Sequence, residues 1–130
     1  MTPPTLAAIE AAIRAGWGRD TCDPDDLADG RPNNPARGQC GPTALVLHDL
    51  IGGDLVLAEV RAGDGLGCRV GYHWWNRVGV VEVDLTREQF AVDEVVGPGE
   101  VVARPPGPPK RCREQYELLR ARVFGALDAL

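Results

Sequence analysis

A cysteine stands at the start of an apolar helical pattern in the segment "RGQCGPTALVLHDLIGG", residues 37–53. The dipole of a helix places partial positive charge at its N-terminus, and this charge favours the thiolate form of a cysteine. Cys40 is therefore a candidate nucleophile, a role that needs a lowered thiol pKa and access to the substrate. Gly41 leaves room for a substrate and offers a backbone N–H as an oxyanion donor, and the Gln39 side-chain amide is a second donor.

A cysteine nucleophile needs a base, and the segment "CRVGYHWWNRVGVVEVDLT" supplies a histidine. This segment reads as two strands joined by a tight turn near Gly79. A turn centred between Val78 and Gly79 places His73 opposite Asp84. A three-residue loop with a bulge at Gly79 is the alternative, and it places His73 opposite Val83.

The first of these registers gives the hairpin a polar face and an apolar face. A histidine held by a carboxylate has a fixed tautomer and can accept the proton of a thiol. The polar face therefore has the groups that a cysteine nucleophile requires, and the apolar face belongs to the core. The expected cross-strand pairs are His73 with Asp84 and Trp75 with Glu82 on the polar face, and Tyr72 with Leu85, Trp74 with Val83 and Asn76 with Val81 on the other.

The elements that must position these residues follow from the hydrophobic pattern. Their order is helix, loop, helix, strands, helix, which predicts an α+β fold: a small antiparallel sheet with helices packed against it. We expect one domain over residues 1–130, with a core at about 5–96, a proline-rich connector at 97–110 and a C-terminal helix at about 111–129. The other expected elements are a helix over 5–15, a long ordered loop over 17–39, a helix from Cys40, a strand over 54–61, and a short helix that starts at "TREQ".

Composition limits the classes of function. The chain has 130 residues, 44% of them hydrophobic and 25% charged, as in an ordinary globular domain. A net charge of -5 argues against nucleic acid or an anionic membrane as a partner. No segment reads as a signal peptide or a membrane span, so a cytoplasmic location is expected, with the four irregularly spaced cysteines as thiols. No cysteine or histidine cluster has metal-ligand spacing, and we expect no metal and no cofactor.

Simpler interpretations exist for several of these residues. A single cysteine before a helix is usually a small buried side chain. His48 shares the apolar face of its helix and is expected to be a core histidine. Trp17, Trp74 and Trp75 are expected in the core or in a cleft wall.

Three sequence blocks resemble the YunG-type family of small, largely uncharacterised bacterial proteins. They are "GQCGPTALVLHDLIGGDLV", "HWWNR" and "VDLTREQF", and they correspond to the GQC-x-x-TAL, H-[YW]-W-N and DLT-x-x-QF blocks of that family. The resemblance covers roughly residues 17–92. The proline-rich segment and the C-terminal helix lie outside it.

The order of a helix-starting cysteine, a strand histidine and an acid on the next strand looks like the papain-like and transglutaminase-like superfamily. This resemblance implies a fold core of that type and acyl chemistry through a thioester, with Cys40 as the nucleophile, His73 as the base and Asp84 as the orienting acid. Papain-type enzymes carry an oxyanion glutamine several residues before the cysteine, whereas Gln39 is adjacent to it. Asn33, Asn34 and a backbone amide are therefore the other candidate donors.

The sequence thus favours a cysteine-dependent acyl-transfer enzyme: an amide or ester hydrolase, a deamidase or an acyltransferase. Its substrate is expected to be a small molecule or a peptide with an amide or ester bond. Trp17, Trp75, Asn76 and Glu82 are the candidates for lining the substrate cleft. The alternative is a non-catalytic module on the same fold that binds a ligand or a protein.

Overall fold

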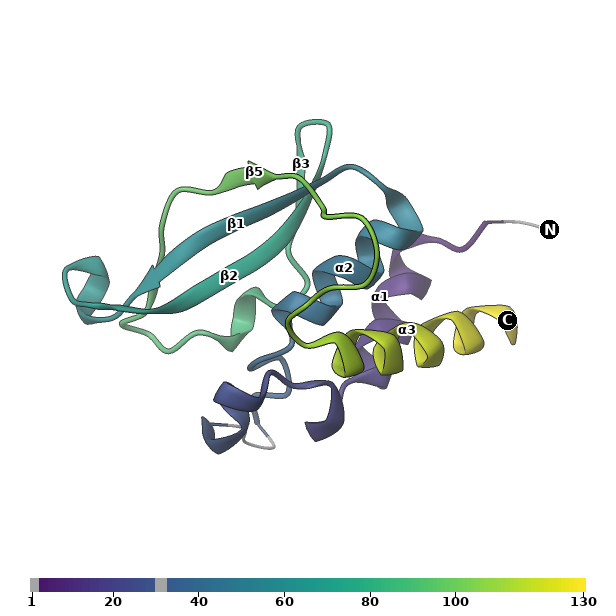
Figure 1. The fold of residues 1–130 in the computed structure, drawn as a ribbon, viewed down its shortest axis with the longest axis horizontal. Coiled ribbons are helices and arrows are strands. Elements are labelled where there is room, and N and C mark those ends of the chain that lie inside the picture. Colours follow the sequence, from purple (N-terminus) through teal and green to yellow (C-terminus); the bar gives the residue numbers. More distant parts are fainter. Residues whose placement is uncertain (1–2, 30–32) are drawn as a thin grey trace.

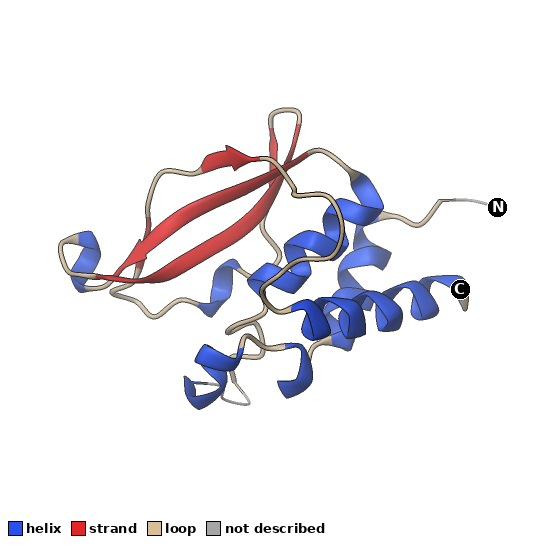
Figure 2. Cartoon of the chain, viewed as in Figure 1, coloured by secondary structure: helices blue, strands red, loops and turns tan. Residues whose placement is uncertain are grey.

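A computed structural model describes residues 3–29 and 33–130 of the chain. Its architecture is α+β: an antiparallel sheet with the α-helices gathered on one side (Figure 2). Helix α2 contacts the sheet directly, and α1 and α3 pack against each other beyond it (Figure 1). The helices are α1 (Leu6–Gly16), α2 (Cys40–Ile51) and α3 (Arg113–Asp128), the 3-10 turns are η1 (Arg19–Thr21), η2 (Pro24–Asp29), η3 (Gly63–Gly65) and η4 (Arg87–Gln89), and the strands are β1 (Asp54–Arg61), β2 (Arg69–Val78), β3 (Val81–Val83), β4 (Val95–Val96) and β5 (Glu100–Val102).

The helices begin and end close to the expected residues. Thr5 caps α1 by accepting a hydrogen bond from the N–H of Ala8 at 3.1 Å. Helix α2 begins at Cys40, as the sequence predicts, and ends at Gly52, whose φ of 69° favours glycine. The nucleophile candidate therefore stands at a helix N-terminus.

The sheet is centred on a long ribbon of β1 and β2. Its strand order is β3-β2-β1-β4, and β5 also pairs with β1, all antiparallel. Part of the segment expected as a connector over 97–110 is therefore a strand, β5. The segment "GPG" between β4 and β5 ends one strand before the next begins, because proline cannot donate a ladder hydrogen bond.

The β2–β3 hairpin has a register that differs from the expected one by two residues. Val78 pairs with Val81, and Asn76 pairs with Val83, so the turn is formed by Gly79 and Val80. Gly79 takes the positive φ of 62° at the first central position, which spares the β-branched residue after it. The expected pairing of His73 directly opposite Asp84, and the other pairs of that register, are therefore wrong. A shift of two residues keeps every side chain on its expected face.

The core lies between the helices and the sheet. It is formed by side chains from all three α-helices, with Val83 contributed by β3. The core expected at residues 5–96 thus extends into the C-terminal helix, which buries its apolar stripe against α1 and α2. The buried cluster consists of Ile9, Ile13, Val46, Leu47, Val83, Tyr116, Leu119 and Val123.

An arginine from the segment after β5 ties the helices together. Arg104 donates to Asp49 Oδ1 at 2.6 Å, to His48 Nδ1 at 3.1 Å and to the hydroxyl of Tyr116 at 2.9 Å. Tyr116 donates in turn to Asp49 Oδ2 at 2.5 Å. His48 is half-buried and hydrogen-bonded in this network rather than packed in an apolar core. The network connects α2, α3 and the segment between β5 and α3.

We predict that Arg104→Met lowers the free energy of unfolding by about 1–3 kcal/mol, because the partly buried Asp49 and Tyr116 lose a charged donor. Urea denaturation measures this change. Arg113→Met is the control, since Arg113 forms an exposed pair with Glu117 one helical turn away and is expected to cost less than about 0.5 kcal/mol. Equal effects of the two substitutions would show that the network adds nothing beyond a surface ion pair.

Candidate functional site

The histidine and the carboxylate that the sequence pairs are in direct contact. His73 Nε2 lies 2.7 Å from Asp84 Oδ2, and the imidazole is fully buried. Because a carboxylate accepts, Nε2 of the neutral imidazole carries the proton and Nδ1 is the basic nitrogen. Within the described part of the chain, Nδ1 has no hydrogen-bond partner. The pair therefore holds an oriented proton acceptor inside the fold.

Two aromatic rings and one backbone amide fix this pair. Trp75 stacks on the imidazole with ring centroids 5.4 Å apart, and Phe90 meets it edge-on at 4.7 Å. The N–H of Thr86 donates to Asp84 Oδ1 at 3.3 Å, which leaves Oδ2 for the histidine. Neither His73 nor Asp84 is therefore free to change its orientation without disturbing its neighbours.

Cys40 begins α2, which packs against β2. Burial raises the pKa of the Cys40 thiol to about 11, and the backbone of Trp74 on β2, which lowers this pKa, only partly offsets the rise. The Asp84 carboxylate is near enough to add to it. The lowered pKa that a nucleophilic Cys40 needs is therefore not found in the resting site, because desolvation outweighs the helix N-terminus. The resting thiol is protonated at neutral pH.

Asp84 and the β2 backbone both influence the pKa of Cys40. In the described part of the chain, no hydrogen bond joins Cys40 to His73. Side chains alternate between the two faces of a strand. Asn76 faces α2, where it donates to the carbonyl oxygen of Ala44 at 3.0 Å, so His73 points to the opposite face. No hydrogen bond joins Cys40 to Nδ1 among the described residues, so proton transfer between them requires the thiol to move toward the imidazole.

Three of the oxyanion candidates have different environments. Gln39 is buried and its amide is used in the fold, accepting from Thr21 Oγ1 at 2.8 Å and donating to the Gly18 carbonyl at 3.0 Å. Asn34 donates to the backbone carbonyl of Gln89 at 2.9 Å, and its Oδ1 is a buried acceptor. Gly41 is different, because a Cβ built there meets nothing within 4 Å. Gly41 is therefore the best placed of the three, because there is open space at its Cα and the side-chain amides of the other two are used in the fold.

The four cleft candidates are also separated by the structure. Trp17 donates to Thr43 Oγ1 at 2.9 Å, one helical turn after Cys40. Trp75 donates to Glu82 Oε2 at 2.6 Å on the His73 face, and this bond lowers the Glu82 pKa. Asn76 is buried against α2, so its amide nitrogen is not available to a cleft. Trp17 therefore lies on the Cys40 side of β2, and Trp75 and Glu82 lie on the His73 side.

Gln89, which sequence reasoning missed, joins the segment before Cys40 to the segment after Asp84. Its Oε1 accepts from the N–H of Gly38 at 3.3 Å, and its carbonyl accepts from Asn34 at 2.9 Å. Gly38 has a φ of 78°, and a Cβ there would collide with Cys22 Sγ. Gln89 is the glutamine of the "DLTREQF" block, but its partners lie about 50 residues earlier. The place of Gln89 in the "DLTREQF" block is the signal that the sequence offers for it.

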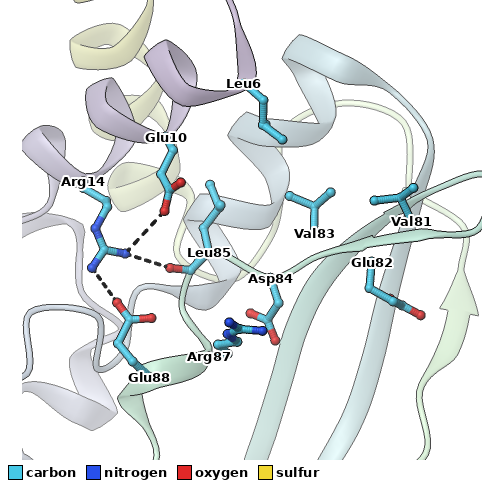
Figure 3. Close-up of a pocket in the computed structure, with 10 residues that line it drawn as sticks. All are labelled: Leu6, Glu10, Arg14, Val81, Glu82, Val83, Asp84, Leu85, Arg87 and Glu88. Atoms are coloured by element: carbon cyan, nitrogen blue, oxygen red, sulfur yellow. Dashed lines mark hydrogen bonds and ion pairs between the residues drawn. The ribbon is translucent and has the colours of Figure 1, made fainter.

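Two open hollows flank this region. One, of about 460 Å³, lies between α1 and the β3–η4 segment and exposes Asp84 and Glu82 (Figure 3). Arg14 reaches across it from α1 and donates to Glu88 at 2.6 Å. The other, of about 620 Å³, is lined by Asn34 and by Phe90, the ring that meets His73 edge-on. Neither hollow is lined by Cys40 or His73.

Three further observations concern the described residues. The four cysteines are free thiols, as expected. No three histidine, cysteine or acidic side chains of the described ranges gather as a metal site would need. In the same ranges, no helix has the length and apolar character to cross a membrane.

Comparisons with known proteins point to one family. The family model described as YunG protein matches residues 5–128. The uncharacterised protein YunG of Bacillus subtilis (strain 168) is 38% identical over 56 residues, a match that spans 43% of this chain and 42% of that protein. No solved structure matches. The match to the family includes α3, which the recognisable sequence blocks did not.

We predict that Cys40 is alkylated slowly at neutral pH and ever faster up to about pH 11, because the thiolate is the reactive form and burial raises the pKa. Iodoacetamide labelling read by mass spectrometry measures each cysteine separately. The exposed Cys68 is the internal control and is expected to react first at pH 7. Preferential labelling of Cys40 below pH 8 would contradict the burial argument.

We predict that Gln89→Ala releases the segment before Cys40. The Gly38 N–H loses its acceptor, so its hydrogen exchange is expected to accelerate and the free energy of unfolding to fall by about 1–3 kcal/mol. Amide exchange and urea denaturation measure the two effects. Arg87→Ala, at an exposed position of the same turn, is the control. Unchanged exchange at Gly38 in Gln89→Ala would rule out this connection.

Proposed function

The chain belongs to the YunG family, and from its site geometry we propose that it is a cysteine-dependent acyl-transfer enzyme. The observation that carries the proposal is the buried His73–Asp84 pair with a free Nδ1, in a fold where a cysteine begins a helix and its thiol pKa is raised by burial and by the Asp84 charge. Burying an imidazole nitrogen without a partner is costly, so a fold that retains one is expected to use it. A base is the use that its chemistry fits best.

The proposed core is papain-like or transglutaminase-like. Three features support it: Cys40 at the start of α2, His73 on β2, and Asp84 directly after β3. In this arrangement the acid binds Nε2 and leaves Nδ1 for the thiol, which agrees with the 2.7 Å contact. The free thiols agree with a reducing compartment, and we propose a cytoplasmic location.

The first half-reaction starts from a neutral pair. When the Cys40 side chain turns toward His73, the thiol proton moves to Nδ1, and Asp84 stabilises the imidazolium through Nε2. The thiolate then attacks the carbonyl carbon of an amide or ester, and the oxyanion lies toward the N–H groups of Cys40 and Gly41 at the start of α2. The tetrahedral intermediate collapses as Nδ1–H protonates the leaving amine or alcohol. A thioester on Cys40 remains.

The second half-reaction resolves the thioester. Nδ1 takes a proton from water or from an amine, which attacks the thioester carbonyl. Collapse returns the sulfur as a thiolate, which recovers its proton from the imidazolium. Water gives a carboxylic acid and an amine gives an amide, so hydrolase, deamidase and acyltransferase activities share this mechanism.

The oxyanion donors are supported by the helix start. Pro42 has no N–H, and Thr43 donates to the Gln39 carbonyl at 3.0 Å. Among the described residues, no acceptor is found for the N–H of Cys40 or Gly41. These two amides are therefore available to a ligand at the site. The Gln39 side chain, bonded on both sides, supports the loop rather than the oxyanion.

A second candidate is a non-catalytic binding module on the same fold. It is favoured by the Cys40 thiol, whose pKa of about 11 and lack of a hydrogen bond with His73 describe a resting side chain rather than an activated one. In that case Nδ1 would accept a hydrogen bond from a ligand. The two candidates differ in whether Cys40 reacts in a manner that depends on His73.

We predict that p-nitrophenyl acetate acetylates Cys40 and that His73→Ala slows this acetylation by about 10²-fold or more, because the general base is lost. Asp84→Asn is expected to slow it less. Intact mass and peptide mapping measure the adduct, and circular dichroism checks the fold of each variant. His48→Ala is the matched control, since it removes the other histidine of the chain and is expected to leave the acetylation unchanged.

The contrary result is equally clear. If acetylation of Cys40 follows only the titration of its own thiol and is indifferent to His73, the enzyme proposal fails and the binding module takes its place.

A further inference from the structure

The backbone of β2 has an open edge that leads to Cys40. Val78 and Val81 flank the two-residue turn and form a directly opposed pair, which in such a hairpin exchanges both backbone hydrogen bonds. The N–H and C=O groups of even-numbered β2 residues therefore point away from β1. The odd-numbered residues, such as Gly71 and His73, pair with β1 instead.

The partner strand on this edge is short. β3 ends at Val83, opposite Asn76, and lies along only one end of β2 (Figure 1). Trp74, Tyr72 and Val70 point their N–H and C=O groups at the same edge, but past the end of β3. Helix α2, which begins at Cys40, packs against β2, and the backbone of Trp74 partly offsets the rise that burial causes in the pKa of the Cys40 thiol. Cys40 therefore lies near the first part of the edge that β3 leaves free.

The next positions on this edge are open. Tyr72 is 49% exposed and Val70 is 53% exposed. For the part of the chain that the structure describes, no partner is recorded for the backbone N–H of either residue. Gly71, which lies between these two residues, has no side chain, and a Cβ built there would meet nothing within 4 Å. From Trp74 to Val70 the edge is about 13 Å long at a strand rise of about 3.3 Å per residue.

The side chains near this edge carry little unbalanced charge. Glu59 forms ion pairs with Arg61 at 3.2 Å and with Arg69 at 3.9 Å. Arg69 also lies over the ring of Tyr72, 4.7 Å from its centroid, and donates to its hydroxyl at 2.6 Å. A ligand here meets an aromatic and aliphatic surface and a row of backbone groups, rather than a charged pocket.

We propose that the open edge of β2, from Val70 to Trp74, binds an extended polypeptide segment as an added strand and delivers one of its backbone carbonyls to Cys40. Alternating N–H and C=O groups two residues apart are matched by another strand and by no small amide or ester. The proposal rests on the proposed function and narrows its substrate class to polypeptides. The polypeptide is then recognised mainly through its backbone, and its affinity is expected to depend only weakly on salt concentration.

Amide hydrogen exchange of the whole chain tests the edge. The N–H groups of Val70 and Tyr72 are expected to exchange rapidly, and those of Gly71 and His73 slowly. Reduced, carboxymethylated lactalbumin serves as the unfolded polypeptide probe, with Cys40→Ala so that no chemistry occurs. At a probe concentration ten times its Kd, exchange at Val70 and Tyr72 is expected to slow by about tenfold. No slowing there would overturn the proposal.

A matched pair of variants separates the backbone from the side chain. Tyr72→Pro removes the outward N–H without removing a β1 hydrogen bond, whereas Tyr72→Ala removes the same ring and keeps the N–H. Loss of probe binding in Tyr72→Pro but not in Tyr72→Ala supports an added strand. Equal binding by both variants overturns it. Exchange that slows with protein concentration alone would also overturn it, because a second copy of the chain would then hold the edge.

The two proposals can fail separately. Acetylation of Cys40 that depends on His73, with no competition from the polypeptide probe, retains the enzyme and removes the polypeptide substrate. Probe binding at the edge with a Cys40 that is indifferent to His73 retains the docking edge and removes the enzyme.

Discussion

The buried hydrogen bond between His73 and Asp84 is the interaction on which the rest of the site depends. An imidazole that is fully removed from water needs polar partners, and only Nε2 has one in the described structure. To supply this partner of Nε2, the chain leaves β3 at Val83 and places Asp84 just past the end of that strand. The same departure ends the pairing of β2 and creates its open edge. One contact thus fixes the imidazole and accompanies the open backbone edge beside it.

The protonated state of the Cys40 thiol follows from burial. A thiolate and an imidazolium formed in a poorly solvated site lose hydration that the protein replaces only in part. The Cys40 thiol accordingly keeps its proton, with a pKa of about 11, and the neighbouring Asp84 charge works in the same direction. Asp84 has the opposite effect on an imidazolium, which it stabilises. The effect of Asp84 therefore depends on whether His73 is charged. A substrate that brings Cys40 to Nδ1 would shift the equilibrium between the neutral pair and the thiolate–imidazolium pair.

The sequence was sufficient for the faces of the hairpin but not for its register. Side chains alternate between the two faces along both arms of the hairpin, so a register two residues away from the expected one still puts His73 and Asp84 on one face. Their contact was therefore predictable. The turn itself depends on Gly79, whose positive φ selects one of several loop lengths. The raised thiol pKa of Cys40 could not be predicted, because a helix start is visible in a sequence and desolvation is not. Gln89 was missed because its partners are defined only once the loop before Cys40 is folded.

An unpaired strand edge beside an exposed aromatic surface is a liability, since such edges pair with other chains. Natural proteins usually cover an edge or place charges on it, and here Arg69 is the charge nearest the open end of β2. Its guanidinium is turned toward Tyr72 and Glu59 rather than held outward as a barrier. The outer edge of β1, by contrast, is covered by β4 and β5, even though each is very short. The fold thus covers one edge of its central ribbon and leaves the other open, and the proposed added strand would cover the β2 edge as β4 and β5 cover that of β1.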